Sequence, residues 1–352
     1  MNIYIRAAQT ISPQDTFPGK GIPENIKVHE NYLKCILPDF KKYFNPIQLR
    51  RMNTLIKSGN VCAIEALKEA GIDKPDAIIT GTGLGCVEDT ERFLHNMLHT
   101  NEGLLAPTSF IQSHNAIGAQ IALNFDCKGY NVLFAHKTAS FESALLDSIL
   151  HFNDSEVSDI LVGGFDEITL ENYNLKKGIG QFKGIPSTNL DIHSSISTGS
   201  IPGEGISFCV LSDHPFSGDY AILESVKILS FCSSEESIKE WFIKILFNHG
   251  LVPDNIDLVL SGLNGDFEND KIYNRILNCC FKNSGHGYYK HLCGEYDTAT
   301  SFGMWFACNA IKRNHIPSHS LLNEKSRPLN HVLIYNQDNM KNHCMILLRR
   351  PS

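Results

Sequence analysis

Short runs of apolar, β-branched residues alternate with helical patterns along most of this 352-residue chain. This alternation restricts the chain to the α/β class, because each hydrophobic period matches one type of element. Helical patterns lie at 60–69, 116–123, 140–152 and 237–248. The strand-like runs lie at 77–80, 131–135, 159–162, 205–211, 257–260, 332–335 and 345–348. We therefore expect an α/β protein whose strands and helices are interleaved.

A chain of this length exceeds what a single hydrophobic core usually fills, so we expect two fused halves. The best junction is the stretch 212–219, which carries Ser, Asp, Pro and Gly. We place the N-terminal half at 1–215 and the C-terminal half at 216–352. Hydrophobic residues make up 42% and charged residues 20%, a balance typical of globular rather than disordered proteins.

The charge pattern and the lack of long apolar runs exclude several classes of protein. A net charge of −7 without a dense Lys/Arg run argues against a nucleic-acid partner. No stretch approaches the roughly 18 apolar residues of a membrane span, and the first residues lack a signal-peptide pattern. The eleven cysteines are scattered and odd in number, which is typical of reduced thiols. We expect a cytoplasmic protein without a membrane span.

Two motifs suggest a metal or a nucleotide, and neither has the required spacing. Cys279 and Cys280 form a loose cluster with His286 and His291, but no second ligand pair has zinc spacing. The glycine run at 81–85 lacks the dinucleotide fingerprint, and no Walker pattern follows it. Such a run more often forms a tight turn. We expect neither a metal nor a cofactor.

The most informative segment runs from Gly129 through a buried strand into a turn and a helix. The turn reads His136-Lys137-Thr138-Ala139-Ser140, and the helix continues through Ala144-Leu145. This segment resembles the β-ketoacyl-ACP synthases (ketosynthases), in which a strand ends at the catalytic cysteine and a buried helix begins there. Further landmarks follow in the family's order: Gly163-Gly164-Phe165-Asp166-Glu167, Gly203-Glu204-Gly205, Lys290-His291-Leu292-Cys293-Gly294-Glu295, Thr298-Ala299-Thr300-Ser301 and Ile316-Pro317.

The resemblance extends from residue 75 to the C-terminus, whereas the residues before 75 match the family poorly. It implies a thiolase-like, five-layer αβαβα fold made of two similar halves. Within this superfamily, the chain is most similar to the chain-length-factor-like ketosynthase homologues of bacterial aryl polyene and flexirubin pigment clusters. The activity of the family is that of a β-ketoacyl-ACP synthase, an acyltransferase.

Counting from Gly129, Thr138 falls on the position of the family's nucleophilic cysteine. A cysteine at a helix N-terminus has a lowered pKa, because the backbone amides and the helix dipole favour the thiolate. A threonine hydroxyl is a far weaker nucleophile without an adjacent base. His136 would not face it on a regular helix, whereas Glu142 could approach it. The favoured interpretation is a buried threonine whose hydroxyl binds a backbone carbonyl.

In the family, two histidines donate hydrogen bonds to the enolate formed on decarboxylation. The first corresponds here to Asn264, in a register that the sequence does not fix. The second corresponds to Glu295, which is placed by Lys290 and Gly294. An ionised carboxylate cannot donate to an enolate, and it would repel a malonyl carboxylate. The structural alternative is a salt bridge from Glu295 to Lys290 or to Lys137.

The family also has a glycine-rich loop between its last two strands, whose amides complete the oxyanion hole. The corresponding stretch 336–343 contains no glycine, so we expect a loop that has lost this role. Phe141 replaces a family glycine after the nucleophile and is expected to fill part of the acyl-binding space. Candidate substrate-contacting residues are Phe141, Lys290 and Cys293. The degenerate catalytic positions are Thr138, Asn264 and Glu295.

These losses favour a catalytically silent subunit that pairs with an active ketosynthase and acts with an acyl carrier protein. The family dimerises through the strand before the nucleophile and its neighbouring helix, here 131–135 and 107–123. A simple loop and capped helix is the alternative for 107–123. A homodimer that binds an acyl chain or acyl carrier protein is a second hypothesis. An active 3-oxoacyl-ACP synthase, acyltransferase or malonyl decarboxylase that uses Thr138 or Cys293 is a third.

Overall fold

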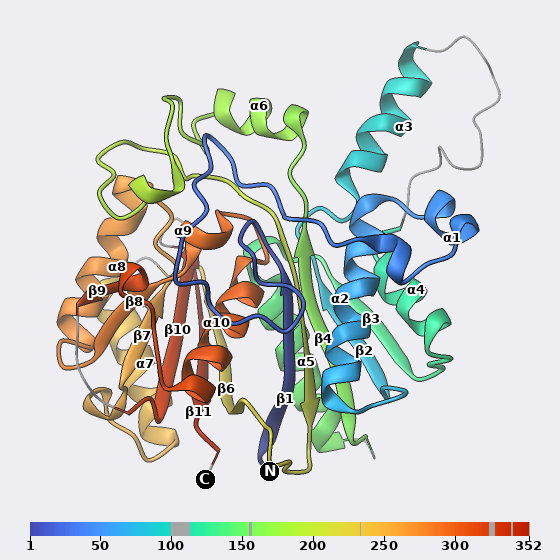
Figure 1. The fold of residues 1–352 in the computed structure, drawn as a ribbon. Coiled ribbons are helices and arrows are strands. Elements are labelled where there is room, and N and C mark those ends of the chain that lie inside the picture. The colour runs from blue at the N-terminus through green and yellow to red at the C-terminus, as the bar shows by residue number, and fades with distance from the viewer. Residues whose placement is uncertain (100–112, 155–156, 233, 324–327, 339–340, 352) are drawn as a thin grey trace.

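The computed structural model of the protein describes residues 1–99, 113–154, 157–232, 234–323, 328–338 and 341–351 (Figure 1). The described strands form one 11-stranded sheet in the order β3-β2-β4-β5-β1-β6-β11-β10-β7-β8-β9. The strands are β1 (Ile3–Ile11), β2 (Ala77–Gly81), β3 (Tyr130–Phe134), β4 (Asp159–Asp166), β5 (Gly205–Ser212), β6 (Ala221–Ser230), β7 (Leu258–Ser261), β8 (Gly285–Tyr288), β9 (Leu321–Asn323), β10 (His331–Asp338) and β11 (Asn342–Arg349). The helices are α1 (Pro46–Arg51), α2 (Thr54–Ala70), α3 (Val87–His99), α4 (Ala116–Asn124), α5 (Ser140–Asp154), α6 (Leu170–Gly178), α7 (Glu235–Asn248), α8 (Phe267–Cys280), α9 (Lys290–Cys293) and α10 (Ala299–Arg313).

The two sides of this sheet repeat one topology. On one side β3, β2 and β4 are parallel, and β5 is antiparallel to both β4 and β1. On the other side β8, β7 and β10 are parallel, and β11 is antiparallel to both β10 and β6. The sides meet where β1 pairs with β6, from Ile3↔Leu223 to Ile5↔Ala221. The predicted pair of similar halves is therefore confirmed, whereas the boundary at residue 215 stays a prediction.

Alternating side chains on each strand separate the molecule into five layers. In β4, Ile160 and Val162 pack in a central core together with α5 and α10, whereas Leu161 packs outside with α2 and α4. In β10, Ile334 likewise faces the central core, and Leu333 faces the outer core of α7 and α8. Because successive strand residues point to opposite faces, each half-sheet is covered on both sides. The predicted αβαβα arrangement is confirmed.

The interleaved elements expected from the hydrophobic pattern are present, with ends that differ by a few residues. The strand expected at 131–135 is β3, and the helix expected at 140–152 is α5. Several elements were missed, among them the central elements β1, β6 and α10. β1 was overlooked because polar residues interrupt its apolar alternation.

The helices described by the structure include none that is both long and apolar enough to cross a membrane.

Candidate functional site

The turn before α5 places Thr138 at the surface of the chain. Lys137 has a positive φ of 53°, and the 3-10 turn from Lys137 to Ala139 leads into the helix. Thr138 is half-buried, and among the described residues no hydrogen bond reaches its hydroxyl. The interpretation of a buried threonine bonded to a carbonyl is therefore wrong. Ser140 takes that role instead, since its buried hydroxyl donates to the carbonyls of Lys137 at 2.6 Å and Thr82 at 2.9 Å.

Among the residues that the structure describes, no base forms a hydrogen bond with the Thr138 hydroxyl. The Nδ1 atom of His136 lies 3.1 Å from the hydroxyl of Ser143, so the imidazole contacts a residue seven positions further along the chain. Glu142 is buried, and among the described residues no hydrogen bond joins its carboxyl group to Thr138. Burial raises the pKa of Glu142 to about 7, whereas Thr300 and the charge of Lys290 act to lower it. Glu142 therefore faces the other central helix, α10, rather than the turn that carries Thr138.

The other two degenerate positions are in direct contact with each other. The Nδ2 of Asn264 donates to Oε2 of Glu295 at 2.6 Å, and the Nζ of Lys290 donates to the same oxygen at 2.7 Å. Lys290 is only 1% exposed, so its ammonium depends on this carboxylate. This contact confirms Lys290 as the salt-bridge partner of Glu295, whereas Lys137 is exposed. It also supports the register that placed Asn264 in the site.

The backbone around Asn264 fixes the direction of its amide group. The side chain of Asp270 accepts from the N–H of Asn264 at 3.0 Å and from that of Gly265 at 2.9 Å. The Oδ1 of Asn264 accepts from the N–H of Asp266 at 3.1 Å. Both ends of the Asn264 amide are therefore used inside the protein, and its N–H group is directed to Glu295.

The described part of the stretch 336–343 is mostly paired strand rather than loop, so the expectation is wrong for these residues, whereas residues 339 and 340 lie outside the described part of the chain. Residues Asn336 to Asp338 continue β10, and Asn342 and His343 begin β11, with Asn336 paired to Cys344. The backbone groups of these paired strands satisfy one another. The Oδ1 of Asn336 accepts from Lys290 at 3.0 Å and from the hydroxyl of Tyr273 at 3.0 Å. Asn336 is thus a member of the site that the sequence interpretation missed.

Phe141 and Cys293 are both enclosed by the central core. Phe141 is 1% exposed and packs with residues from both halves of the sheet. Cys293 is fully buried, and burial raises the pKa of its thiol well above the ordinary value. Its Sγ lies 3.3 Å from the carbonyl of Gly294. A thiolate nucleophile at Cys293 is therefore strongly disfavoured.

The glycine run at 81–85 forms a turn that binds an internal carboxylate. Oδ1 of Asp166 accepts from the hydroxyl of Thr82 at 2.9 Å and from the N–H of Gly83 at 2.8 Å. Oδ2 accepts from the hydroxyl of Thr298 at 2.7 Å and from its N–H at 2.9 Å. Since Thr82 also accepts from Ser140, this turn joins the N-terminal ends of α5 and α10. The amides that a nucleotide phosphate would need are occupied by Asp166.

The four residues of the loose zinc cluster have different partners. Cys279 and Cys280 contact each other at 3.3 Å, His286 binds the carbonyl of Phe281, and His291 binds His319 at 3.0 Å. Among the residues that the structure describes, no group of three or more His, Cys, Asp and Glu side chains is arranged to hold a metal ion.

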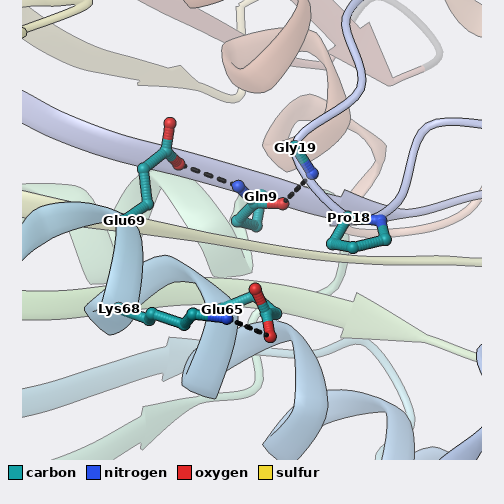
Figure 2. Close-up of a pocket in the computed structure, with 6 residues that line it drawn as sticks. All are labelled: Gln9, Pro18, Gly19, Glu65, Lys68 and Glu69. Atoms are coloured by element: carbon teal, nitrogen blue, oxygen red, sulfur yellow. Dashed lines mark hydrogen bonds and ion pairs between the residues drawn. The ribbon is translucent and has the colours of Figure 1, made fainter.

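A cavity of about 310 Å³ lies apart from these residues, between α2 and the N-terminal segment (Figure 2). Its polar groups are paired with one another: Gln9 donates to Glu69 and accepts from the N–H of Gly19, and Lys68 lies 3.5 Å from Glu65. Because none of the site residues lines this cavity, we assign it no part in the chemistry.

Comparison with known proteins agrees with this architecture. The sequence profile of the "Beta-ketoacyl synthase, N-terminal domain" matches residues 8–215, which is more than half of the chain. The chain belongs to the beta-ketoacyl synthase family. The match begins at residue 8, so the expectation that residues before 75 fit the family poorly is wrong. The N-terminal residues supply β1 and α2, which carry the fold through packing rather than through a recognisable motif.

Several solved structures of low sequence identity share the fold over nearly the whole chain. The ishigamide ketosynthase/chain length factor has 16% identity, a TM-score of 0.78, and coverage of 100% of this chain and 99% of that one. The ketosynthase ApeO in complex with its chain length factor ApeC from Xenorhabdus doucetiae has 15% identity, a TM-score of 0.76, and coverage of 99% and 98%. A type II acyl-carrier protein in complex with its ketosynthase, AntDE:AntF, has 15% identity, a TM-score of 0.73, and coverage of 99% and 99%. A search of curated protein sequences finds no significant match.

Removing the Glu295 carboxylate should destabilise this beta-ketoacyl synthase homologue, because the buried Lys290 ammonium would lose its counter-ion. We expect Glu295→Ala to lower the free energy of unfolding by roughly 3 kcal/mol. The matched control is Glu268→Ala, which breaks the exposed pair with Lys271 and should cost less than about 1 kcal/mol. Denaturant unfolding of both variants measures the difference, and equal losses would contradict the account.

Glu142 should make stability depend on pH. Its folded pKa of about 7 lies above the ordinary value of 4.5, so the folded state holds a proton that the unfolded state has released. Its contribution is therefore present at pH 4.5 and is lost as pH rises towards 7 and beyond. We expect Glu142→Gln to be more stable than the wild type at pH 8 by up to about 3 kcal/mol, and by much less at pH 5. Urea unfolding at both pH values tests this, and a gap independent of pH would refute it.

Proposed function

We propose that this chain is a catalytically silent, chain-length-factor-type subunit that pairs with an active β-ketoacyl-ACP synthase in the cytoplasm. The pair would act in fatty-acid or polyketide synthesis of the aryl polyene type. The observation that carries the proposal is the closed contact of Lys290, Glu295 and Asn264, in which the groups at the site bind one another.

Condensation requires hydrogen-bond donors that point at the developing enolate. The donors described at this site are directed at other residues of the chain, which supports the proposal. The Asn264 amide donates to Glu295, and the Lys290 ammonium donates to Glu295 and Asn336. Nearby, burial and the charge of Asp166 raise the pKa of Asp297 to about 7, with Glu295 adding to the rise. A malonyl carboxylate would therefore meet a site that already holds several acidic groups.

The edge of the sheet at β3 supports the pairing half of the proposal. β3 is bonded to β2 on one side, and no other described strand covers its second side. Exposed edge strands are rarely left open in isolated proteins, because their free N–H and C=O groups recruit further strands. Tyr130, Leu123 and Leu150 also expose apolar surface on β3, α4 and α5. The proposed second contact segment, 107–123, lies partly outside the described residues, and its described part includes α4.

The similar structures agree with this type of assembly. Two of them are a ketosynthase with its chain length factor, and a third is an acyl-carrier protein in complex with its ketosynthase. We propose the same classes of partner for this chain, an active ketosynthase and an acyl carrier protein. The alternative of acyl transfer or decarboxylation by this chain has less support, because Thr138 lacks a base and the Cys293 thiol is buried.

The purified chain should not become acylated. Incubation with acyl-ACP followed by intact-mass measurement should give the unmodified mass, since the Thr138 hydroxyl is not activated. The positive control is the active ketosynthase, whose cysteine should gain the acyl mass under the same conditions. An adduct on this chain that disappears in Thr138→Ala would contradict catalytic silence.

Blocking the open side of β3 should prevent pairing without unfolding the chain. The N–H of Thr82 donates to the carbonyl of Phe134, so Phe134 faces β2 and the N–H of Leu133 faces the open side. Proline is tolerated at an edge position whose N–H faces outward, and it removes that donor. We expect Leu133→Pro to lose the complex with a co-expressed ketosynthase, as seen by size-exclusion chromatography with light scattering.

The control for this experiment is Val132→Pro, which removes a donor on the β2 side and should instead lower the melting temperature of the chain. Leu133→Pro should keep a melting temperature near that of the wild type. A complex that survives Leu133→Pro would exclude β3 as the contact, and a stable homodimer that ignores the ketosynthase would count against the heterodimer.

A further inference from the structure

The C-terminal end of α8 carries two adjacent cysteines whose sulfur atoms meet. The Sγ atoms of Cys279 and Cys280 lie 3.3 Å apart. At Cys62 and Cys127, by contrast, the thiol contacts a backbone carbonyl. All eleven cysteines lie in the described part of the chain, and Cys279 is the one that is exposed. A thiol reagent in solution therefore meets this pair first.

The pair lies across the boundary between the outer core and solvent. α8 packs with α7 on the outer face of the sheet (Figure 1). The buried side chain of Cys280 joins Phe242, Phe281 and Tyr335 in this outer core. Cys279 is exposed, because successive positions on a helix point about 100° apart. One thiol is therefore held by packing, and its neighbour is open to solvent.

The backbone of α8 does not favour a disulfide between the two cysteines. Disulfide-bonded residues usually have Cα atoms about 4.4–6.8 Å apart. Adjacent residues joined by a trans peptide have Cα atoms only about 3.8 Å apart. The N–H of Phe281 donates to the carbonyl of Leu277 at 3.0 Å and keeps the last helical turn closed. We therefore expect the two thiols to stay reduced while the helix is intact.

A single atom that is bonded to both sulfurs fits the pair better than a disulfide does. Two bonds of about 2.3 Å, the length of a zinc–sulfur bond, to sulfurs 3.3 Å apart enclose an angle of about 90°. Pyramidal trivalent arsenic takes an angle close to this, whereas tetrahedral zinc requires a wider one. Zinc also requires further ligands, and the described residues hold no group of three or more His, Cys, Asp and Glu side chains suited to a metal. The spacing therefore favours a trivalent centre with two sulfur ligands.

The protonation of the pair also favours this chemistry over oxidation or alkylation. Burial raises the pKa of the Cys280 thiol, and its hydrogen bond with Cys279 adds to the rise, whereas the charge of Lys239 acts to lower the pKa. A neutral thiol reacts poorly with peroxides and alkylating agents, which require the thiolate. Condensation with a hydroxyl group on arsenic consumes the neutral thiol, because the thiol proton leaves with that hydroxyl as water.

We propose that Cys279 and Cys280 form a dithiol site for trivalent arsenicals, in which one arsenic atom bridges the two sulfurs. Two thiols and an arsenical with two hydroxyl groups give two As–S bonds and two molecules of water. Arsenic stays trivalent, so the step needs neither an oxidant nor a reductant. The 14 residues of α8 span about 20 Å, and Asp270, which fixes the backbone of Asn264, lies near the other end. The inference is therefore independent of the proposed function.

The test uses phenylarsine oxide and intact-mass measurement of the native full-length chain. We expect the wild type to gain one phenylarsenic group, and an excess of dimercaptopropanol to remove it. Cys279→Ser and Cys280→Ser each leave one thiol of the pair and should weaken binding roughly tenfold or more, because the second As–S bond is lost. Since Cys279 is exposed, Cys279→Ser should not disturb the fold. The matched control is Cys232→Ser, which removes a half-buried cysteine outside the pair and should bind like the wild type.

Alkylation gives a second readout at the exposed thiol. Iodoacetamide should modify Cys279 in the free protein and should fail to do so after phenylarsine oxide has bound. Zinc ions used in place of the arsenical should leave Cys279 open to alkylation, and protection by zinc would overturn the choice of a trivalent centre. A wild type that takes up no arsenical, or full uptake by Cys279→Ser, would overturn the site itself. Failure of the chain to pair with a ketosynthase would leave these results unchanged.

Discussion

The buried ammonium of Lys290 is the constraint on which the site depends. With 1% exposure it cannot be solvated by bulk water, so the protein must supply a counter-ion and acceptors from within. Glu295 supplies the charge, and Asn336 supplies a second acceptor from β10. The same oxygen of Glu295 also accepts from Asn264, whose own backbone is fixed by Asp270. One buried cation thus accounts for the residue types at Glu295, Asn264 and Asn336.

The central helices explain why these groups converge. α5 and α10 pack between the two half-sheets, and their N-terminal ends are joined through the turn at Thr82. Asp166 is the link to Thr298, and burial raises the pKa of its carboxyl despite its hydrogen bonds. The ends of both helices are therefore held by internal groups. This arrangement preserves the fold of a beta-ketoacyl synthase without requiring a bound substrate to complete it.

The sequence predicted the α/β class from hydrophobic alternation and the two halves from chain length and the family resemblance. It offered Lys290 and Lys137 as alternative partners of Glu295, and the structure selects Lys290. It did not predict the role of Asn336, since a stretch without glycine was interpreted as an altered loop rather than as paired strands. The prediction that Thr138 is buried and bonded to a carbonyl was also wrong, because burial at a turn depends on neighbours that are distant in sequence. β1 and α2 were overlooked as family elements for the same reason, since packing leaves no local motif. The Asp166 contacts join positions more than 80 residues apart, and no pattern in the chain indicates them.

An assembly of one working and one silent subunit gives each chain a distinct role. The working partner would carry the acyl chain, while this chain would contribute its β3 edge and the surfaces around it.

The measurement that tests this division of roles most directly is the condensation rate of the complex, with one nucleophile position changed at a time. Replacing the cysteine of the partner by alanine should abolish the reaction, and Thr138→Ala in this chain should leave the rate unchanged. Loss of condensation on Thr138→Ala, with the complex still assembled, would show that this chain takes part in the chemistry.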